Sequence, residues 1–410
     1  MMRSMFAGVS GVRSHQTMTD VVANNIANVN TVGFKVSRAQ FADTLSQQLR
    51  GAAGSGEATA GINPQQVGLG VKVASTNMSF AQGGMQLTGR ATDVAIQGDG
   101  FFIMGLGAQR LYTRAGSFSF DDDGQLTDPL GGAVMGWNVD QTGTININGP
   151  IEPLRVPVNA TIPPVATTSV RLGGNLNADA AIGTQQSTAI DIVDNLGAVH
   201  RITFDFMKTA DNAWTMSAID PNGATIGTSN LVFDPASGDI TSPANPTLSY
   251  TPAGTTAVNF EVDWGPVGTS EALTQYGGVA DAQAMEQNGT EVGFLRSFAI
   301  SDDGSLSGVF SNGETQTLGQ LALATFANPS GLLSAGDSRF RGSNASGQAL
   351  LGVPNTAGRG TIAAGALEMS NADLSEEFTQ LIVAQRGFQA NSRIITVSDE
   401  MIQELVNLKR

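Results

Sequence analysis

The sequence contains no cysteine and only two histidines, His15 and His200. The lack of cysteine excludes disulfides, thiolate metal sites and cysteine nucleophiles. A zinc site would need carboxylate ligands, because no third histidine is present, and such a ligand set is uncommon. We expect neither histidine to act as a general base, although this is the usual catalytic role of the residue. The sequence therefore predicts no metal site and no bound cofactor.

Charged residues are scarce and mostly acidic. They make up 14% of the chain, against about 25% in an average soluble protein. The net charge is −15, and no basic run is present. Nucleic acids and anionic membrane surfaces both attract basic patches, so we expect neither as a partner. Residues 209–295 contain ten acidic residues and no basic one, which predicts a solvated acidic face.

Long apolar runs are also missing. No stretch of about 18 apolar residues is present, so we expect no membrane insertion. The first twelve residues include Arg3 but no continuous apolar segment, and they do not resemble a secretory signal peptide. If the protein acts outside the cell, another kind of exporter must carry it.

Motifs of enzymes and calcium sites are incomplete. Asp121–Gly124 resembles the start of a calcium loop, but its glycine is at position 4 and position 12 is Gly132, whereas an EF-hand requires glycine at position 6 and glutamate at position 12. A hairpin turn is the better interpretation. Glu261 and Asp263 would suit a glycosidase only if a cleft joined them, and we expect two solvated acids. No nucleophile elbow or nucleotide-binding glycine pattern occurs. We predict that the protein is not an enzyme.

Both ends of the chain show the spacing of amphipathic helices. Apolar residues recur at intervals of three and four in the first 26 residues and again after residue 373. Ser370 and Asn371 are expected to cap a C-terminal helix of about 57 Å over residues 371–408, and Lys409 and Arg410 would complement its dipole. That helix needs the N-terminal helix, neighbouring subunits or both to bury its stripe. The helix-packing residues that this spacing selects are Val9, Val22, Leu374, Phe378, Leu381, Phe388, Met401 and Leu405.

The residues between the ends predict strands. Residues 112–120 alternate and end in an Asp-Asp-Gly turn, which is typical of a hairpin. The segment Phe118–Leu126 recurs at Phe298–Leu306 with the same Phe, Asp-Asp-Gly and Leu. This repeat predicts two equivalent hairpins in one domain that is built from both halves of the chain. The strands expected at 189–193, 199–206 and 214–219 then belong to an inserted domain, which follows a proline-rich linker.

The predicted fold is mainly β with long N- and C-terminal α-helices, with nested discontinuous β-domains between the paired terminal helices. Residues 1–30 and 371–410 form the terminal helical assembly domain, and 31–70 and 355–370 form linker or loop segments. Residues 71–145 and 276–354 form an inner β-domain, and 146–275 form an inserted outer β-domain. Residues 50–64 and 355–365 are small and polar, so we expect flexible loops there.

This organisation is typical of a self-assembling subunit. The terminal helices carry apolar faces, and heterologous contacts that do not close into a ring produce a helical filament. The alternative is that the two helices pair within one monomer and only stabilise it.

Several motifs resemble the bacterial flagellar rod and hook family. The family's long assembly motif is matched by Asn-Asn-Ile-Ala-Asn-Val-Asn-Thr-Val-Gly-Phe-Lys over residues 24–35, at Asn24, Asn25, Ile26, Ala27, Asn28, Gly33, Phe34 and Lys35. Segments 2–6, 93–102, 112–118, 370–374 and 385–391 are also similar to the family. The resemblance covers nearly the whole chain and is weakest over residues 150–270. Segments 193–214 and 308–324, together with the length, are most similar to the members that build the hook, because the distal rod members are expected to be much shorter.

The resemblance implies a structural subunit that polymerises into the curved hollow flagellar hook. Such a hook is a universal joint that passes motor torque from rod to filament. The implied partners are further copies of the chain, the hook cap protein, the distal rod protein, the hook–filament junction protein and the flagellar type III export apparatus. The implied location is extracellular, at the flagellar hook that is associated with the basal body. Two alternatives stay open: a distal rod subunit of the basal body with an enlarged middle, and an extracellular β-domain protein that acts as adhesin or hydrolase.

Overall fold

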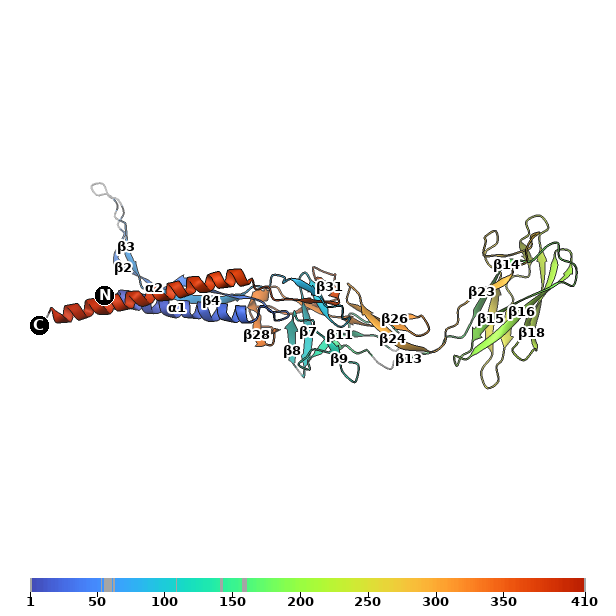
Figure 1. Ribbon diagram of the computed structural model, residues 1–410, viewed down its shortest axis with the longest axis horizontal. Coiled ribbons are helices and arrows are strands. Elements are labelled where there is room, and N and C mark those ends of the chain that lie inside the picture. Colours follow the sequence, from blue (N-terminus) through green and yellow to red (C-terminus); the bar gives the residue numbers. More distant parts are fainter. Residues whose placement is uncertain are drawn as a thin grey trace. The chain divides into compact units, whose positions relative to one another are not determined.

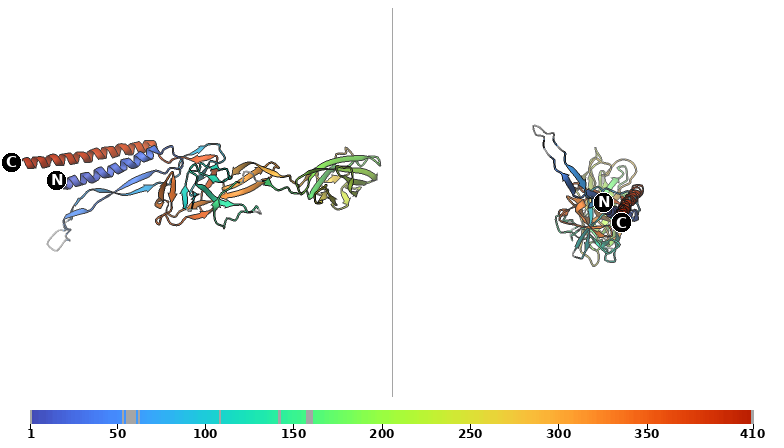
Figure 2. Two further views of the ribbon diagram at one scale, coloured as in Figure 1. Left: turned by 90° about the horizontal axis from the view of Figure 1, so that it is seen from below. Right: turned by 90° about the vertical axis from the view of Figure 1, so that its left-hand side faces the viewer.

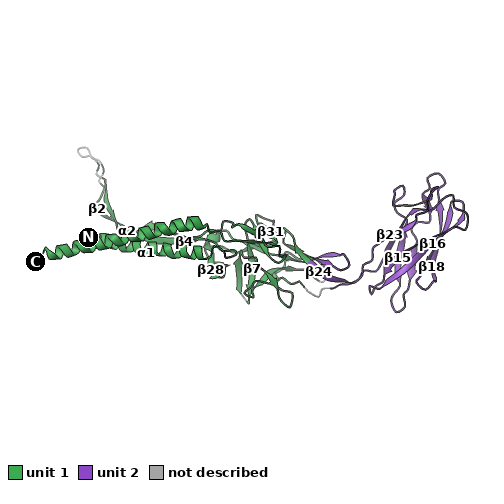
Figure 3. Ribbon diagram, viewed as in Figure 1, with its two compact units in different colours: residues 1–157, 298–307, 317–410 green, residues 158–297, 308–316 purple. Residues whose placement is uncertain are grey.

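The chain is folded as two compact units, and the second is inserted in the sequence of the first. A computed structural model describes residues 2–52, 54, 61, 63–107, 109–140, 143–156 and 161–408. The first unit comprises residues 1–157, 298–307 and 317–410, and the second comprises 158–297 and 308–316 (Figure 3). The fold is mainly β, with one helix near each end of the chain, as the sequence predicts (Figure 1).

The first unit contains both helices and most of the strands. Its elements are α1 (Met2–Ala27), β1 (Ser37–Asp43), β2 (Ser46–Arg50), β3 (Gln65–Gly68), β4 (Val71–Met78), β5 (Met85–Leu87), β6 (Val94–Gln97), β7 (Phe101–Leu106), β8 (Gln109–Thr113), β9 (Ser119–Phe120), β10 (Leu126–Thr127), β11 (Ala133–Asn138), β12 (Glu152–Pro153), β27 (Leu323–Thr325), the 3-10 helix η1 (Pro329–Gly331), β28 (Leu333–Gly336), β29 (Arg339–Arg341), β30 (Leu350–Gly352), β31 (Thr361–Ala364), β32 (Ala366–Glu368) and α2 (Leu374–Asn407).

The second unit contains strands alone among its described residues. They are β13 (Thr161–Ile162), β14 (Ser169–Asn175), β15 (Gln185–Val193), β16 (Val199–Ala210), β17 (Ala213–Ile219), β18 (Thr225–Phe233), β19 (Ile240–Ser242), β20 (Thr247–Tyr250), β21 (Val258–Asp263), β22 (Leu273–Thr274) and β23 (Gln283–Gln287). Three further strands include residues of both units: β24 (Gly293–Ile300), β25 (Ser305–Phe310) and β26 (Thr315–Leu321).

Helices α1 and α2 lie side by side and run antiparallel (Figure 2). The hydroxyl oxygens of Ser4 and Ser398 are 3.3 Å apart near one end of the pair. The predicted cap of α2 at Ser370 or Asn371 is wrong. Asp373 is the N-cap, and its carboxylate accepts hydrogen bonds from the backbone N–H groups of residues 375 and 376 at 2.8 and 3.3 Å, which satisfies two donors that a helix start leaves free. Residues 409 and 410 lie outside the described residues.

The segments 31–70 and 355–370, predicted as linkers or loops, contain five strands. β1 pairs antiparallel with β4, and β2 pairs with β3. β31 pairs with β6, and β32 pairs with β5. β2 and β3 could not be predicted from the sequence, because all their residues are exposed and they show no alternation of apolar and polar residues. The flexible loop predicted at 50–64 lies partly outside the described residues.

The repeated hairpin is confirmed. Gly124 N–H donates to the Asp121 carbonyl at 3.0 Å in one copy, and Gly304 N–H donates to the Ser301 carbonyl at 2.9 Å in the other. The rings of Phe120 and Phe298 meet edge to face at 5.0 Å. The large sheet has the strand order β13-β24-β25-β26-β11-β7-β8-β29-β28. Strands from both halves of the sequence therefore complete one sheet.

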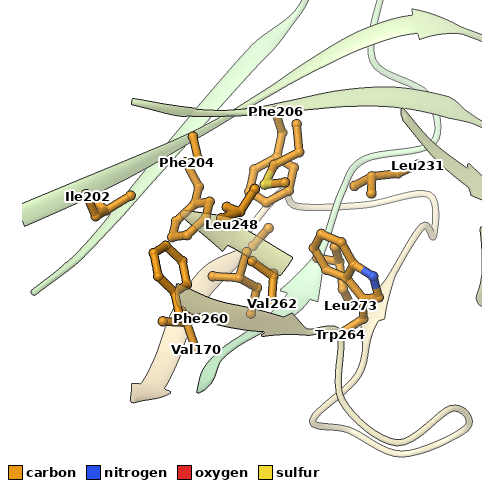
Figure 4. Packing of buried hydrophobic residues seen from close by; sticks show 14 of the residues in the cluster. Val170, Ile202, Phe204, Phe206, Leu231, Leu248, Phe260, Val262, Trp264 and Leu273 are labelled. Atoms are coloured by element: carbon orange, nitrogen blue, oxygen red, sulfur yellow. The ribbon is translucent and has the colours of Figure 1, made fainter. Parts of the chain in front are cut away.

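The second unit is a sandwich of two sheets around one core (Figure 4). One sheet has the order β15-β16-β17-β18-β19, and the other has the order β20-β21-β14-β22, with β23 paired to β14. Alternate residues of β16, among them Phe204 and Phe206, point inward to meet Phe260 and Val262 of β21. The sequence predicts the inserted domain at 146–275, whereas the compact unit extends to 297, because β23 pairs with β14.

Candidate assembly site

Three buried charged side chains meet where the terminal helices join the first unit's strands. Lys35 Nζ lies 2.6 Å from Glu368 Oε1, and neither side chain has any exposed surface. Arg114 Nη1 lies 3.3 Å from Glu368 Oε2. The N–H of Gly83 donates to Glu368 Oε1 at 2.9 Å, and Lys35 Nζ also donates to the carbonyl of Ala81 at 2.8 Å. We call Lys35, Arg114 and Glu368 the Lys35 cluster.

Burial dominates the electrostatics of the Lys35 cluster. It is the largest cause of the lowered pKa of Lys35, and the charge of Arg114 lowers that pKa too, whereas the hydrogen bond to Glu368 and the charge of that carboxylate raise it. Burial likewise lowers the pKa of Arg114. One carboxylate thus faces two cations in a place where water is excluded, and removing it would leave both cations without an anion.

Two asparagine side chains connect the end of α1 with the start of α2. The amide group of Asn25 donates to the Ser37 carbonyl at 2.8 Å and to Glu377 Oε2 at 3.1 Å, and its oxygen accepts from the Ser37 N–H. Asn371 accepts from the Val36 N–H at 2.9 Å and donates to the carbonyls of Ser79 and Ala81 at 3.0 Å. An amide has both donors and acceptors, so Asn371 satisfies two backbone segments at once.

The turn after α1 requires a glycine. Gly33 has a φ of +68°, and a Cβ there would lie 2.4 Å from the backbone nitrogen of Ala115. Its N–H donates to the carbonyl of Glu368 at 2.8 Å. A side chain at this position would meet rigid backbone and adopt a strained conformation, so the glycine allows the Lys35 cluster to close.

The other residues of the assembly motif end α1 or line its surface. Asn28 donates from its amide to the Asn24 carbonyl at 2.9 Å. Ile26 is half-buried, Ala27 is the exposed last residue of α1, and Phe34 is half-buried. Asn24, Asn28 and Phe34 help to line a hollow of about 450 Å³. The structure therefore places all eight motif residues around one junction within the chain, and their role in assembly remains a prediction.

The two helices touch each other along small and polar side chains. Gly8, Gly11 and Ser14 of α1 are buried, as are Ala384 and Ser398 of α2. A Cβ at Gly11 would lie 2.5 Å from the Asn391 side chain, and one at Gly387 would lie 2.4 Å from the ring of His15. The absence of bulk on both sides lets the helices approach closely.

Most of the predicted helix-packing residues do not lie in this contact. Val22 is buried, and Val9 and Leu381 are half-buried. The other five, namely Leu374, Phe378, Phe388, Met401 and Leu405, are 40–51% exposed, so the chain itself does not bury them, and their packing against neighbouring subunits stays a prediction. At about 100° per residue, the first three lie on one flank of the line that faces α1 and the last two lie on the other flank.

The candidate catalytic residues are not brought together. His15 lies in α1, with its ring 5.5 Å from that of Phe41, and His200 Nε2 lies 2.9 Å from Asp194 Oδ2 in the second unit. Asp263 binds Arg171 Nε at 3.1 Å and not a partner carboxylate. No group of three or more metal-ligating side chains is found among the described residues, and no described helix is long and apolar enough to cross a membrane.

Comparison with known proteins decides the family. The flagellar hook protein FlgE of Treponema pallidum is 37% identical over 100% of both chains. The chain belongs to the flagellar hook protein family. The hook protein FlgE of Escherichia coli is 35% identical over 98% of both chains. A crystal structure of hook protein FlgE2 of Helicobacter pylori, 17% identical, shares the fold with a TM-score of 0.51, and it covers 69% of this chain and 100% of that chain.

Four domain profiles of this family match along the chain. They are described as Flagella basal body rod protein (5–35), Flagellar hook protein FlgE/F/G D1 domain (95–178), Flagellar basal body protein FlaE D2 domain (159–290) and Flagellar basal body rod FlgEFG protein C-terminal (363–408). A basal-body rod protein FlgG of Bacillus subtilis is also 32% identical over 100% of both chains. A rod relative therefore also matches along the whole chain, and the hook assignment depends on the hook relatives themselves.

The sequence did not indicate Arg114 and Glu368 as parts of the site. Their partners lie 254 and 333 residues away along the chain, so spacing contains no sign of the contact. One signal was available: both are charged residues between uncharged neighbours in a chain with few charges.

Proposed function

We propose that this flagellar hook family member is the subunit of a curved, hollow hook that acts as a universal joint between rod and filament. The observation that carries the proposal is full-length similarity to hook proteins, together with helices whose apolar residues face outward. Apolar side chains that the chain itself leaves exposed in this way favour contacts with further copies. The terminal helices then form the inner assembly domain.

The proposed partners follow from this role. The chain reaches the cell exterior through the flagellar type III export apparatus and polymerises below the hook cap protein. The distal rod protein adjoins the polymer at one end, and the hook–filament junction protein adjoins it at the other. We expect no catalytic activity. A distal rod subunit is the second candidate, because the rod protein of Bacillus subtilis matches over the full length.

Electron microscopy of basal bodies from cells that lack the gene tests the proposal. We expect a complete rod and rings with nothing beyond them. A truncated rod would favour the distal rod subunit, and intact flagella would refute both candidates. Re-expression of the chain in the same cells is the control, and it should restore hooks.

A further inference from the structure

The last two turns of α2 present an apolar stripe that the described chain does not cover. Ser4 lies opposite Ser398 and α1 begins at Met2, so no described residue of α1 lies beside 401–408. Met401, Leu405 and Leu408 follow at intervals of four and three, which aligns them on one face. They are 42%, 50% and 83% exposed. The described residues leave this face open to a partner from outside the chain.

A groove with apolar lining residues, like those of the α2 stripe, lies between α1 and β4. Its volume is about 400 Å³, and Val9, Val71 and Val73 are among the residues that line it. Ser10 Oγ accepts a hydrogen bond from the Val71 N–H at 3.2 Å, which holds the strand against the helix. The groove thus offers a fixed apolar surface with room for a few side chains.

Charge complementarity identifies the occupant. The groove is also lined by Arg13 and Lys72, both exposed. Glu400 and Glu404 are exposed beside the apolar stripe of α2. We propose that the Met401–Leu408 stripe of one subunit docks in the α1–β4 groove of a second copy of this chain.

The geometry of this contact agrees with a polymer. An amphipathic helix that binds a groove uses anchors at i, i+4 and i+7, which is the spacing of Met401, Leu405 and Leu408. The groove and the stripe are different surfaces of one subunit, so the contact is heterologous, and a heterologous contact that does not close into a ring repeats along a filament. The inference rests on the proposed function, because it assigns one interface within the proposed homopolymer.

Cysteine crosslinking tests the contact, since the chain has no cysteine of its own. Hooks are isolated from cells that produce both a Val9→Cys chain and a Leu405→Cys chain, and are then oxidised. Because the two cysteines are on different chains, a heterodimer reports a contact between copies. The matched control replaces Leu405→Cys with Ile182→Cys, at an exposed apolar residue of the second unit. We expect heterodimers only with Leu405→Cys. Polymers that crosslink no better than the control would overturn the docking proposal and leave the proposed function intact.

A charge exchange provides an independent readout. Arg13→Glu alone should lower the yield of polymer by up to about fivefold, which is the largest effect expected for one exposed charge pair. Glu404→Arg alone should have a similar effect, and the double variant should recover most of the yield. Equal losses in the single and double variants would contradict the pairing. If the unmodified chain formed no polymer in the same cells, the proposed function itself would fail.

Discussion

Glu368→Gln should destabilise the first unit far more than the same change at an exposed ion pair. The substitution keeps the shape of the side chain but leaves Lys35 and Arg114 buried without an anion. Breaking a buried pair in this way costs about 3–5 kcal/mol. For a unit of this size that loss corresponds to a fall in melting temperature of roughly 6–20 °C. Differential scanning calorimetry measures it, with the transition of the second unit as internal reference.

Glu376→Gln is the matched control. Glu376 pairs with Arg38 at 2.7 Å, but the two side chains are 49% and 55% exposed. Exposed pairs contribute at most about 1 kcal/mol. If Glu368→Gln lowered the free energy of unfolding no more than Glu376→Gln, the role given to the Lys35 cluster would be refuted.

The same variant should depend on pH in a defined direction. Without Glu368, Lys35 loses the hydrogen bond and the charge that raise its pKa, so burial lowers that pKa further. The unfolded chain then binds the proton more tightly than the folded one, and the free energy of unfolding rises with pH between the two pKa values. We therefore expect the difference in free energy of unfolding between the unmodified chain and Glu368→Gln to be smaller at pH 10 than at pH 7. A difference that stays constant would show that Lys35 does not titrate in the variant.

Three further changes test other parts of the structure. Gly33→Ala should lower the free energy of unfolding by at least about 2 kcal/mol, because it adds a backbone collision to the strain of a positive φ. The control is Gly313→Ala, where φ is also positive but a Cβ would meet nothing within 4 Å, and we expect a loss of about 1 kcal/mol there. Equal losses in the two variants would contradict this reasoning. Burial alone would raise the pKa of Asp194, but hydrogen bonds from His200 and two backbone N–H groups lower it. The stability that the ionised carboxylate contributes is therefore lost as pH falls below about 4. Asp194→Asn should reduce the fall of the second unit's melting temperature at acid pH, and an unchanged fall would exclude this carboxylate as its cause. Phe388→Asp should prevent polymerisation, measured by sedimentation, while calorimetry should show that both units are still folded. Normal polymer from this variant would refute the assignment of this exposed face to subunit contacts.

Local pattern predicted much of the fold. The Asp-Asp-Gly repeat identified two hairpins of one sheet, and the alternation of β16 identified a strand with one buried face. Both signals depend on neighbours in sequence, which a single chain displays directly. The motif of residues 24–35 likewise identified the junction at which the site lies.

The remaining features depend on contacts that no local pattern contains. Helical spacing selected Phe388 and Met401 as one stripe, although the six residues from Phe388 to Ile394 advance the helix by about 600° and so change its face. The residues that do meet α1 are small, among them Ala384 and Ser398, and small residues carry little signal in a hydrophobic pattern. Glu368 was missed because its partner is 333 residues distant.

That separation has a consequence for the order of events in time. A chain that emerges N-terminus first presents Lys35 long before Glu368, and the strands that pair with β7 and β11 also arrive late. The second unit, by contrast, draws its sandwich from within residues 158–297. Contacts between distant residues form more slowly than those between near ones. The inserted second unit is therefore expected to fold before the first unit. The Lys35 cluster is expected to form last, because it requires that Glu368 has emerged.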